Sequence, residues 1–210
     1  MHDATNVLRA DAEGLRAASV WLLQGGVAVV PTDTVYGLAA SPDAADAVRA
    51  IYRLKGRPEG MHLPVLAASI AQVRDLGVDF TDAAHTLAQR WWPGPLTMAF
   101  GFARERHRPE WLDGRNEVAV RIPDHDFLRS LLERTGPLLV TSANPHGAPT
   151  PRTAAAVVAS LGTSVALVVD GGTLHDVPST LVNVHTADPA VEREGAIARA
   201  GIAEALQGTP

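Results

Sequence analysis

Short apolar runs alternate along this chain with segments whose apolar residues recur at helical spacing, and this alternation constrains the fold more than any other feature. Asp11 to Gln24 shows the helical spacing and ends at Gly25-Gly26, a typical helix stop. Val27–Val30 then has the length and composition of a buried strand. The alternation predicts one α/β domain over residues 10–205, with terminal tails at residues 1–9 and 206–210.

Two further segments have sequence patterns that predict their local structure. Ser41-Pro42, followed by Asp43 and Asp46, predicts a helix start, since it offers a side-chain acceptor, a proline for the first turn and acids at the positive end of the helix dipole. This helix should end near Leu54. Residues 103–116 are rich in Arg and Pro, so we expect an irregular segment there.

Composition excludes several classes of site and location. The absence of Cys excludes disulfide scaffolds, thiolate zinc sites, iron–sulfur clusters and cysteine catalysis. The first residues lack the features of a signal peptide, and no apolar stretch approaches the roughly 18–20 residues of a membrane span, so we expect a soluble, cytoplasmic protein without a membrane partner. The net charge of −5 argues against a protein coated with nucleic acid, but it leaves room for a local basic cleft.

Hydroxyl, amide and cationic residues follow several of the predicted strands and helices. In open α/β sheets, ligands bind where loops leave the carboxyl ends of strands, so these residues could share one site. Several cations with hydroxyls and no obvious nucleophile indicate stabilisation of a polyphosphate and a carboxylate rather than covalent catalysis. The residues are Thr32, Thr34, Lys55, Arg57, Arg121, Ser142, Asn144, Ser179 and Arg193.

Simpler interpretations exist for three of these segments. Lys55-Gly56-Arg57-Pro58 could be a solvated helix C-cap, while Pro31–Thr34 and Ser142–Pro145 could be turns. Lys55 is still unusual, because it is the only lysine and the other 17 of the 18 basic residues are arginines. Arg121 also needs an explanation, since a charge within the apolar strand Val118–Ile122 must reach an edge, a partner or a ligand.

Taken together and in order, seven segments resemble the YrdC-like family of threonylcarbamoyl-AMP synthases. They extend over most of the chain, and their ordered K-x-R and S-x-N pair is the most diagnostic part. The segments are Pro31-Thr32-Asp33-Thr34-Val35-Tyr36-Gly37-Leu38, Leu54-Lys55-Gly56-Arg57-Pro58, Trp92-Pro93-Gly94-Pro95-Leu96-Thr97, Val118-Ala119-Val120-Arg121-Ile122-Pro123-Asp124-His125, Ser142-Ala143-Asn144-Pro145-His146-Gly147, Asp170-Gly171-Gly172 and Ser179-Thr180.

The resemblance implies an α/β fold with an open, twisted mixed sheet and flanking helices around a concave cleft. It implies that L-threonine, bicarbonate and ATP form threonylcarbamoyl-AMP and pyrophosphate. Mg²⁺ would be held mainly through the phosphates, without a protein metal site. A downstream tRNA threonylcarbamoyltransferase complex would use the product to modify tRNA next to the anticodon, and direct tRNA binding is a secondary expectation.

The resemblance also distributes roles among the candidate residues. Thr32, Arg121 and Ser179 would bind threonine, with the Arg121 guanidinium on its carboxylate. Lys55 and Arg57 would be catalytic by stabilising charge. The implied nucleotide-binding residues are Lys55, Arg57, Ser142, Asn144, Thr150 and Arg193.

The chain departs from the family pattern at two positions of the cleft, and two other functions are alternatives. Leu66 stands where many members have His, and Pro178 stands where the usual motif has Glu, so these contacts of the cleft differ. One alternative is a protein that binds tRNA or ribosomal RNA in the cleft. The other is a relative that forms a carbamoyl-adenylate.

Overall fold

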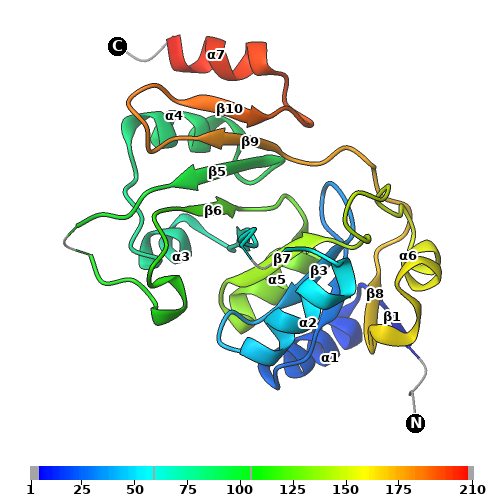
Figure 1. Cartoon of the computed structure of the whole chain (residues 1–210). Helices are drawn as coiled ribbons and strands as arrows, with labels where there is room; N and C mark the ends of the chain where they lie inside the picture. Colours follow the sequence, from blue (N-terminus) through cyan, green and yellow to red (C-terminus); the bar gives the residue numbers. More distant parts are fainter. Residues whose placement is uncertain (1–4, 59, 105, 208–210) are drawn as a thin grey trace.

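One mixed β-sheet runs through the computed structural model, which describes residues 5–58, 60–104 and 106–207 (Figure 1). The strand order is β1-β8-β2-β3-β7-β4-β6-β5-β9-β10, so neighbours in the sheet are mostly distant in the sequence. The strands are β1 (Asn6–Arg9), β2 (Ala28–Val30), β3 (Gly37–Ala40), β4 (Val65–Leu66), β5 (Leu96–Phe100), β6 (Val118–Arg121), β7 (Leu138–Ser142), β8 (Leu167–Asp170), β9 (Thr180–Asn183) and β10 (Ala190–Arg193).

Parallel and antiparallel pairs both occur in this sheet. β1 and β2 run parallel to β8, β4 runs parallel to β6, and β5 runs parallel to β9. The pairs β2–β3, β3–β7, β4–β7, β5–β6 and β9–β10 are antiparallel. The expected open mixed sheet is therefore confirmed, with β1 and β10 at its two edges (Figure 1).

Helices cover the two faces of the sheet unequally. On one face, α1 and α5 pack their leucines against β2, β7 and β8. On the other face, α2, α4, α6 and α7 join a larger core that extends along the whole sheet. The helices are α1 (Ala12–Leu23), α2 (Ala45–Lys55), α3 (Ile70–Asp75), α4 (Asp82–Trp91), α5 (Asp126–Thr135), α6 (Ala154–Leu161) and α7 (Arg199–Gln207), with short 3₁₀ turns η1 (Glu110–Leu112) and η2 (Gly162–Ser164).

The α1/α5 face extends past these two helices onto β4, β5, β6 and β9. Side chains alternate across a strand, so Met98 and Val120 enter the larger core while their neighbours point to the opposite face. Those neighbours include Thr97 of β5 and Arg121 of β6. Polar residues inside apolar strands therefore lie where this face of the sheet is open.

Three local expectations need correction. Residues 6–9 are not a tail, because they form the edge strand β1 and pair with residues 167–170 of β8; residues 206 and 207 belong to α7. Residues 1–4 and 208–210 of the expected tails lie outside the described residues. The helix predicted to begin at Ser41-Pro42 begins at Ala45, because Ser41 to Ala44 form a turn in which the Ala44 amide donates to the Ser41 carbonyl (3.1 Å).

Candidate active site

A cavity of about 190 Å³ occupies the open part of the α1/α5 face. Strands β4, β5, β6, β7 and β9 form its floor. The loops that follow β2 and α2, the segment before β9 and the end of β10 close its sides. Seven of the predicted site residues line it: Thr32, Thr34, Arg57, Arg121, Ser142, Ser179 and Arg193. Segments far apart in the sequence thus bring hydroxyls and guanidinium groups into one space.

The loop after β2 is held in shape by the hydroxyl of Thr32. This oxygen donates to the carbonyl of Val35 (2.8 Å) and accepts from the backbone amides of Thr34 (3.0 Å) and Val35 (3.1 Å). It also lies 3.0 Å from the hydroxyl of Thr34. The turn predicted for Pro31–Thr34 is therefore present, and it presents both threonines to the cavity.

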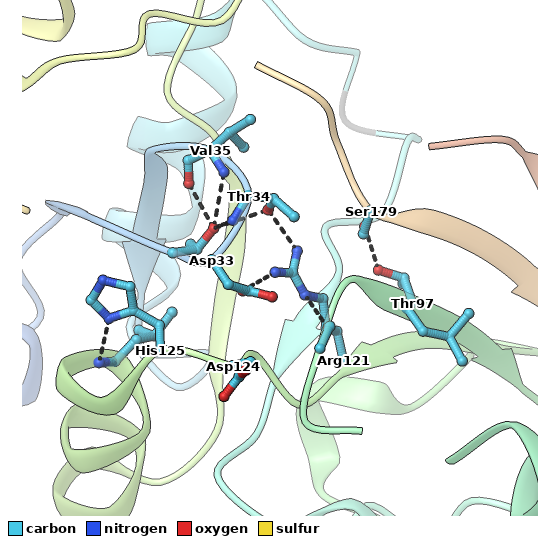
Figure 2. Close-up of polar contacts among 12 residues, drawn as sticks. Asp33, Thr34, Val35, Thr97, Arg121, Asp124, His125 and Ser179 are labelled. Carbon is cyan, nitrogen blue, oxygen red and sulfur yellow. Dashed lines mark hydrogen bonds and ion pairs between the residues drawn. The ribbon is translucent and has the colours of Figure 1, made fainter. Parts of the chain in front are cut away.

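Arg121 is a buried cation in the cavity wall and is 5% exposed. Figure 2 shows its guanidinium facing Asp33 and Thr34. Its guanidinium donates to the carbonyl of Gly94 through Nε (3.0 Å), to the hydroxyl of Thr34 through Nη1 (2.9 Å) and to the carboxylate of Asp33 through Nη2. Burial lowers the pKa of Arg121, and the neighbouring Asp33 opposes this effect. The charged residue within strand β6 is thus paired with Asp33 and also lines the cavity.

Ser179 and Thr97 join the two strands β9 and β5 at the floor. Their hydroxyls lie 2.8 Å apart (Figure 2). Arg193 from β10 donates to the carbonyl of Ser179 through Nη2 (2.9 Å). Burial and, to a smaller extent, the positive charge of Arg57 lower the pKa of Arg193, so these two arginines act on the same region of the cavity.

Lys55 lies beside the cavity rather than in its wall. It is the last residue of α2 and is 4% exposed. Its Nζ donates to the carbonyls of Ser142 (2.5 Å) and Asn144 (2.7 Å) and to Oδ1 of Asn144 (3.2 Å). Burial, and then the charge of Arg57, lower the pKa of Lys55 to about 8. Lys55 and Asn144 are thus in direct contact, and the buried ammonium is surrounded by neutral oxygens.

Gly56 lies between Lys55 and Arg57, and the chain changes direction at this residue. Gly56 adopts a left-handed conformation (φ 59°), which favours glycine and ends α2. Arg57 then reaches the cavity wall, while its Nε donates to the carbonyl of Met61 (3.1 Å) and its Nη2 to the carbonyl of His62 (3.2 Å). The segment is a helix C-cap, as one interpretation held, and it also supplies a cation to the site.

Not every predicted residue lies in the cavity wall. Asn144 is buried behind it, where its amide donates to the carbonyls of Pro145 (3.1 Å) and Ala148 (2.5 Å). Thr150 lies further along the same loop, is half-buried and does not line the cavity. Leu66 and Pro178, the two departures from the family pattern, both line it.

Sequence patterns did not identify two further candidate residues of the site, Asp33 and Thr97. Asp33 was hidden within a turn motif, where a carboxylate has an ordinary structural explanation. Thr97 is a polar residue in the apolar run Leu96–Phe100, and this break in the pattern was the available signal. Their importance depends on partners more than 80 residues away, namely Arg121 and Ser179.

The site offers little to a metal ion. Within residues 5–58, 60–104 and 106–207, no group of three or more His, Asp or Glu side chains could hold one. The cavity wall also lacks a carboxylate among the described residues. Separately, no helix in the described part of the chain is long and apolar enough to cross a membrane.

Comparisons with known proteins agree on one family. A family model for Sua5, YciO and YrdC proteins, described as "Telomere recombination", matches residues 21–195. A threonylcarbamoyl-AMP synthase of Bacillus subtilis is 36% identical over 199 residues, which cover 94% of this chain and 58% of that protein. A putative threonylcarbamoyl-AMP synthase of Mycobacterium tuberculosis H37Rv is 34% identical over 196 residues, which cover 92% of this chain and 89% of that protein.

A solved structure gives the same result. The crystal structure of Pyrococcus abyssi Sua5 complexed with L-threonine superposes with a TM-score of 0.86 at 31% identity, covering 97% of this chain and 61% of the other. The chain thus spans about three fifths of the length of the Bacillus and Pyrococcus proteins.

Proposed function

The chain belongs to the Sua5/YciO/YrdC family, and from this membership and the geometry of its cavity we propose that it is a threonylcarbamoyl-AMP synthase. The proposed reaction converts L-threonine, bicarbonate and ATP into L-threonylcarbamoyl-AMP, pyrophosphate and water. Similarity to proteins of that name supports the assignment.

One observation carries the proposal: a single cavity combines a carboxylate-binding group with a set of cations suited to phosphates. Arg121, Thr32 and Ser179 provide a guanidinium with two hydroxyls, as an amino acid requires. Arg57, Arg193 and Ser142 provide two further guanidinium groups and a hydroxyl, as a nucleotide requires. A common cavity lets both substrates react without leaving the protein.

We propose that this chain catalyses by alignment and charge stabilisation. Arg121 binds the threonine carboxylate and so positions the amine, which must be neutral to attack the bicarbonate carbon; the new C–N bond forms as water leaves, and the product is a carbamate. The resulting carbamate oxygen attacks the α-phosphorus of ATP, and the P–O bond to pyrophosphate breaks. Arg57 and Arg193 stabilise the charge that develops on the pyrophosphate. Mg²⁺ bound to the phosphates would supply further neutralisation when present.

Lys55 has a different role in this proposal from that of the arginines. Its Nζ is surrounded by oxygens of Ser142 and Asn144, so it fixes the loop that presents Ser142 to the nucleotide. Its positive charge also contributes to the potential in the cavity, because the oxygens of Ser142 and Asn144 to which Nζ donates are neutral.

We further propose that the product passes to a tRNA threonylcarbamoyltransferase complex in the cytoplasm. Threonylcarbamoyl-AMP is a mixed anhydride, and this class of compound transfers its acyl group to an acceptor such as the amine of a tRNA base. Direct tRNA binding would need cations on the surface of the chain, and its net charge of −5 does not favour this.

The test is pyrophosphate release by the purified chain with ATP, Mg²⁺ and bicarbonate, in the presence and absence of L-threonine. We expect threonine-dependent release from the wild type and from Arg53→Ala, an exposed control on α2. We expect little release from Arg121→Ala or Arg57→Ala. Release independent of threonine, or its absence from a folded wild type, would contradict the proposal.

Two further assays separate the alternatives if the proposal fails. The first replaces threonine and bicarbonate by carbamoyl phosphate. Pyrophosphate release under these conditions would indicate an enzyme that forms a carbamoyl-adenylate. A fluorescence titration with tRNA, showing affinity that falls steeply with salt, would support RNA binding.

A further inference from the structure

The ion pair between Arg121 and Asp33 is buried but incomplete. Their side chains are 6% and 11% exposed, respectively. One carboxylate oxygen, Oδ1, accepts from Nη2 of Arg121 (Figure 2). The other oxygen, Oδ2, is buried and has no hydrogen-bond partner among the described residues. A pair that served only the fold would gain from two parallel hydrogen bonds, which this pair lacks.

The position of the Arg121 guanidinium does not depend on Asp33. Nε is fixed by the carbonyl of Gly94 (3.0 Å) and Nη1 by the hydroxyl of Thr34 (2.9 Å). Two anchored nitrogens of a planar group determine its plane and its direction. The contribution that only Asp33 makes is its negative charge.

Arg121 needs that charge when the cavity is empty. It is almost fully buried, and Arg193 adds a repulsive positive charge nearby. Asp124, another carboxylate close to Asp33, is engaged with Arg129 through a 3.0 Å ion pair. Without Asp33, the guanidinium would be a buried and unpaired charge, which is strongly destabilising.

A bound carboxylate would change this balance. The guanidinium has five N–H donors and the structure uses three, so two remain for a ligand. A ligand carboxylate on these donors places a second negative charge close to Asp33. The two carboxylates repel each other and share one positive charge, so Asp33 lowers the affinity for the ligand.

We propose that Asp33 is a resident counter-ion: it stabilises the empty site by neutralising Arg121 and weakens the binding of the substrate carboxylate. Asp33 acts through Arg121 and does not itself contact the substrate. The inference rests on the proposed function, because it requires an amino-acid carboxylate on Arg121. It assigns to Asp33 two effects of opposite sign, on folding and on binding.

Asp33→Asn tests the two effects together, because it removes the charge and keeps an oxygen for Nη2. The matched control is Asp46→Asn, which removes a carboxylate that is 97% exposed and paired with Arg49. Thermal unfolding is measured without ligand, and calorimetric titration gives the Kd of L-threonine. L-threoninol, which lacks the carboxylate, serves as the ligand control.

We expect Asp33→Asn to lower Tm by about 5 °C or more and to bind L-threonine about tenfold more tightly than the wild type does. The affinity for L-threoninol should not increase, and Asp46→Asn should resemble the wild type. Unchanged or weaker threonine binding by Asp33→Asn would refute the inference, since a purely structural or orienting role predicts that result. If the wild type itself does not bind threonine, the proposed function fails and the inference fails with it.

A variant that does not fold without ligand still gives an answer. In that case the recovery of the folded circular dichroism signal is measured as L-threonine is added. Recovery with L-threonine and not with L-threoninol is expected, because the carboxylate replaces the missing charge. No recovery with either compound at concentrations that saturate the wild type would refute the inference.

Discussion

Replacing Lys55 by Met removes the ammonium from the oxygens that surround it and keeps the length of the side chain. The carbonyl of Ser142 and both the carbonyl and Oδ1 of Asn144 then lose their charged donor. These oxygens belong to the loop after β7, which presents Ser142 to the cavity. We expect the variant to be less stable and to lose pyrophosphate release.

Two opposing terms set the size of the loss in stability. Hydrogen bonds from a charged donor contribute about 1.5–3 kcal/mol each, so three of them contribute about 5–9 kcal/mol. Burial of the charge lowers the pKa of Lys55 to about 8, and removing this penalty returns about 2–3 kcal/mol after a discount for solvent screening. The net loss is about 2–7 kcal/mol, or a fall in Tm of about 5–25 °C for a chain of this size.

Thermal unfolding followed by circular dichroism measures this change, with Arg53→Met as the control because Arg53 is exposed on the same helix. The control should unfold at the wild-type temperature and keep its activity. An unchanged Tm for Lys55→Met, with activity lost, would refute the argument that the lysine holds the loop. The ammonium would then act directly on the nucleotide.

Three further predictions follow from the same contacts. Arg121→Gln should raise the KM for threonine by about 100-fold or more while the KM for ATP changes less, as measured by pyrophosphate release at varied substrate concentrations. Ile51 is a fully buried residue of α2, and Ile51→Ala should lower the free energy of unfolding by about 2–5 kcal/mol in urea titrations. The pKa of Lys55 is lowered to about 8 in the folded chain, so the unfolded chain binds more protons between pH 8 and about 10.5. Stability should therefore rise with pH in this window, and urea unfolding of the wild type and Lys55→Met should show the rise only in the wild type.

The sequence was sufficient for elements whose pattern is local and strong. The helix near Asp11–Gln24 and the strand near Val27–Val30 occur where periodicity placed them, because burial on one side or both sides leaves a clear apolar pattern. Strand β1 left no such pattern, since it is a short and mostly exposed edge strand whose partner lies 161 residues away. Its pairing with β8 depends on tertiary structure alone.

The candidate site divides in the same way. Residues placed after strands could be expected to converge, and Thr32, Arg121 and Ser179 do line one cavity. The contact between Arg121 and Asp33 could not be predicted, because it joins residues 88 positions apart in a register that only the folded sheet defines. The same holds for the direction of Lys55, which depends on where the chain after β7 places its carbonyls.

The two buried cations are neutralised differently, and the difference matches the charges of the proposed substrates. Nζ of Lys55 donates to neutral oxygens of Ser142 and Asn144, so its positive charge remains available near Arg57, where a polyphosphate would bind. Arg121 is paired with Asp33, whose carboxylate offsets the charge of the guanidinium. Threonine is a zwitterion, and a strongly positive site would bind its carboxylate at the expense of its ammonium group. We infer that the carboxylate of Asp33 makes the amino-acid end of the cavity less positive than the nucleotide end.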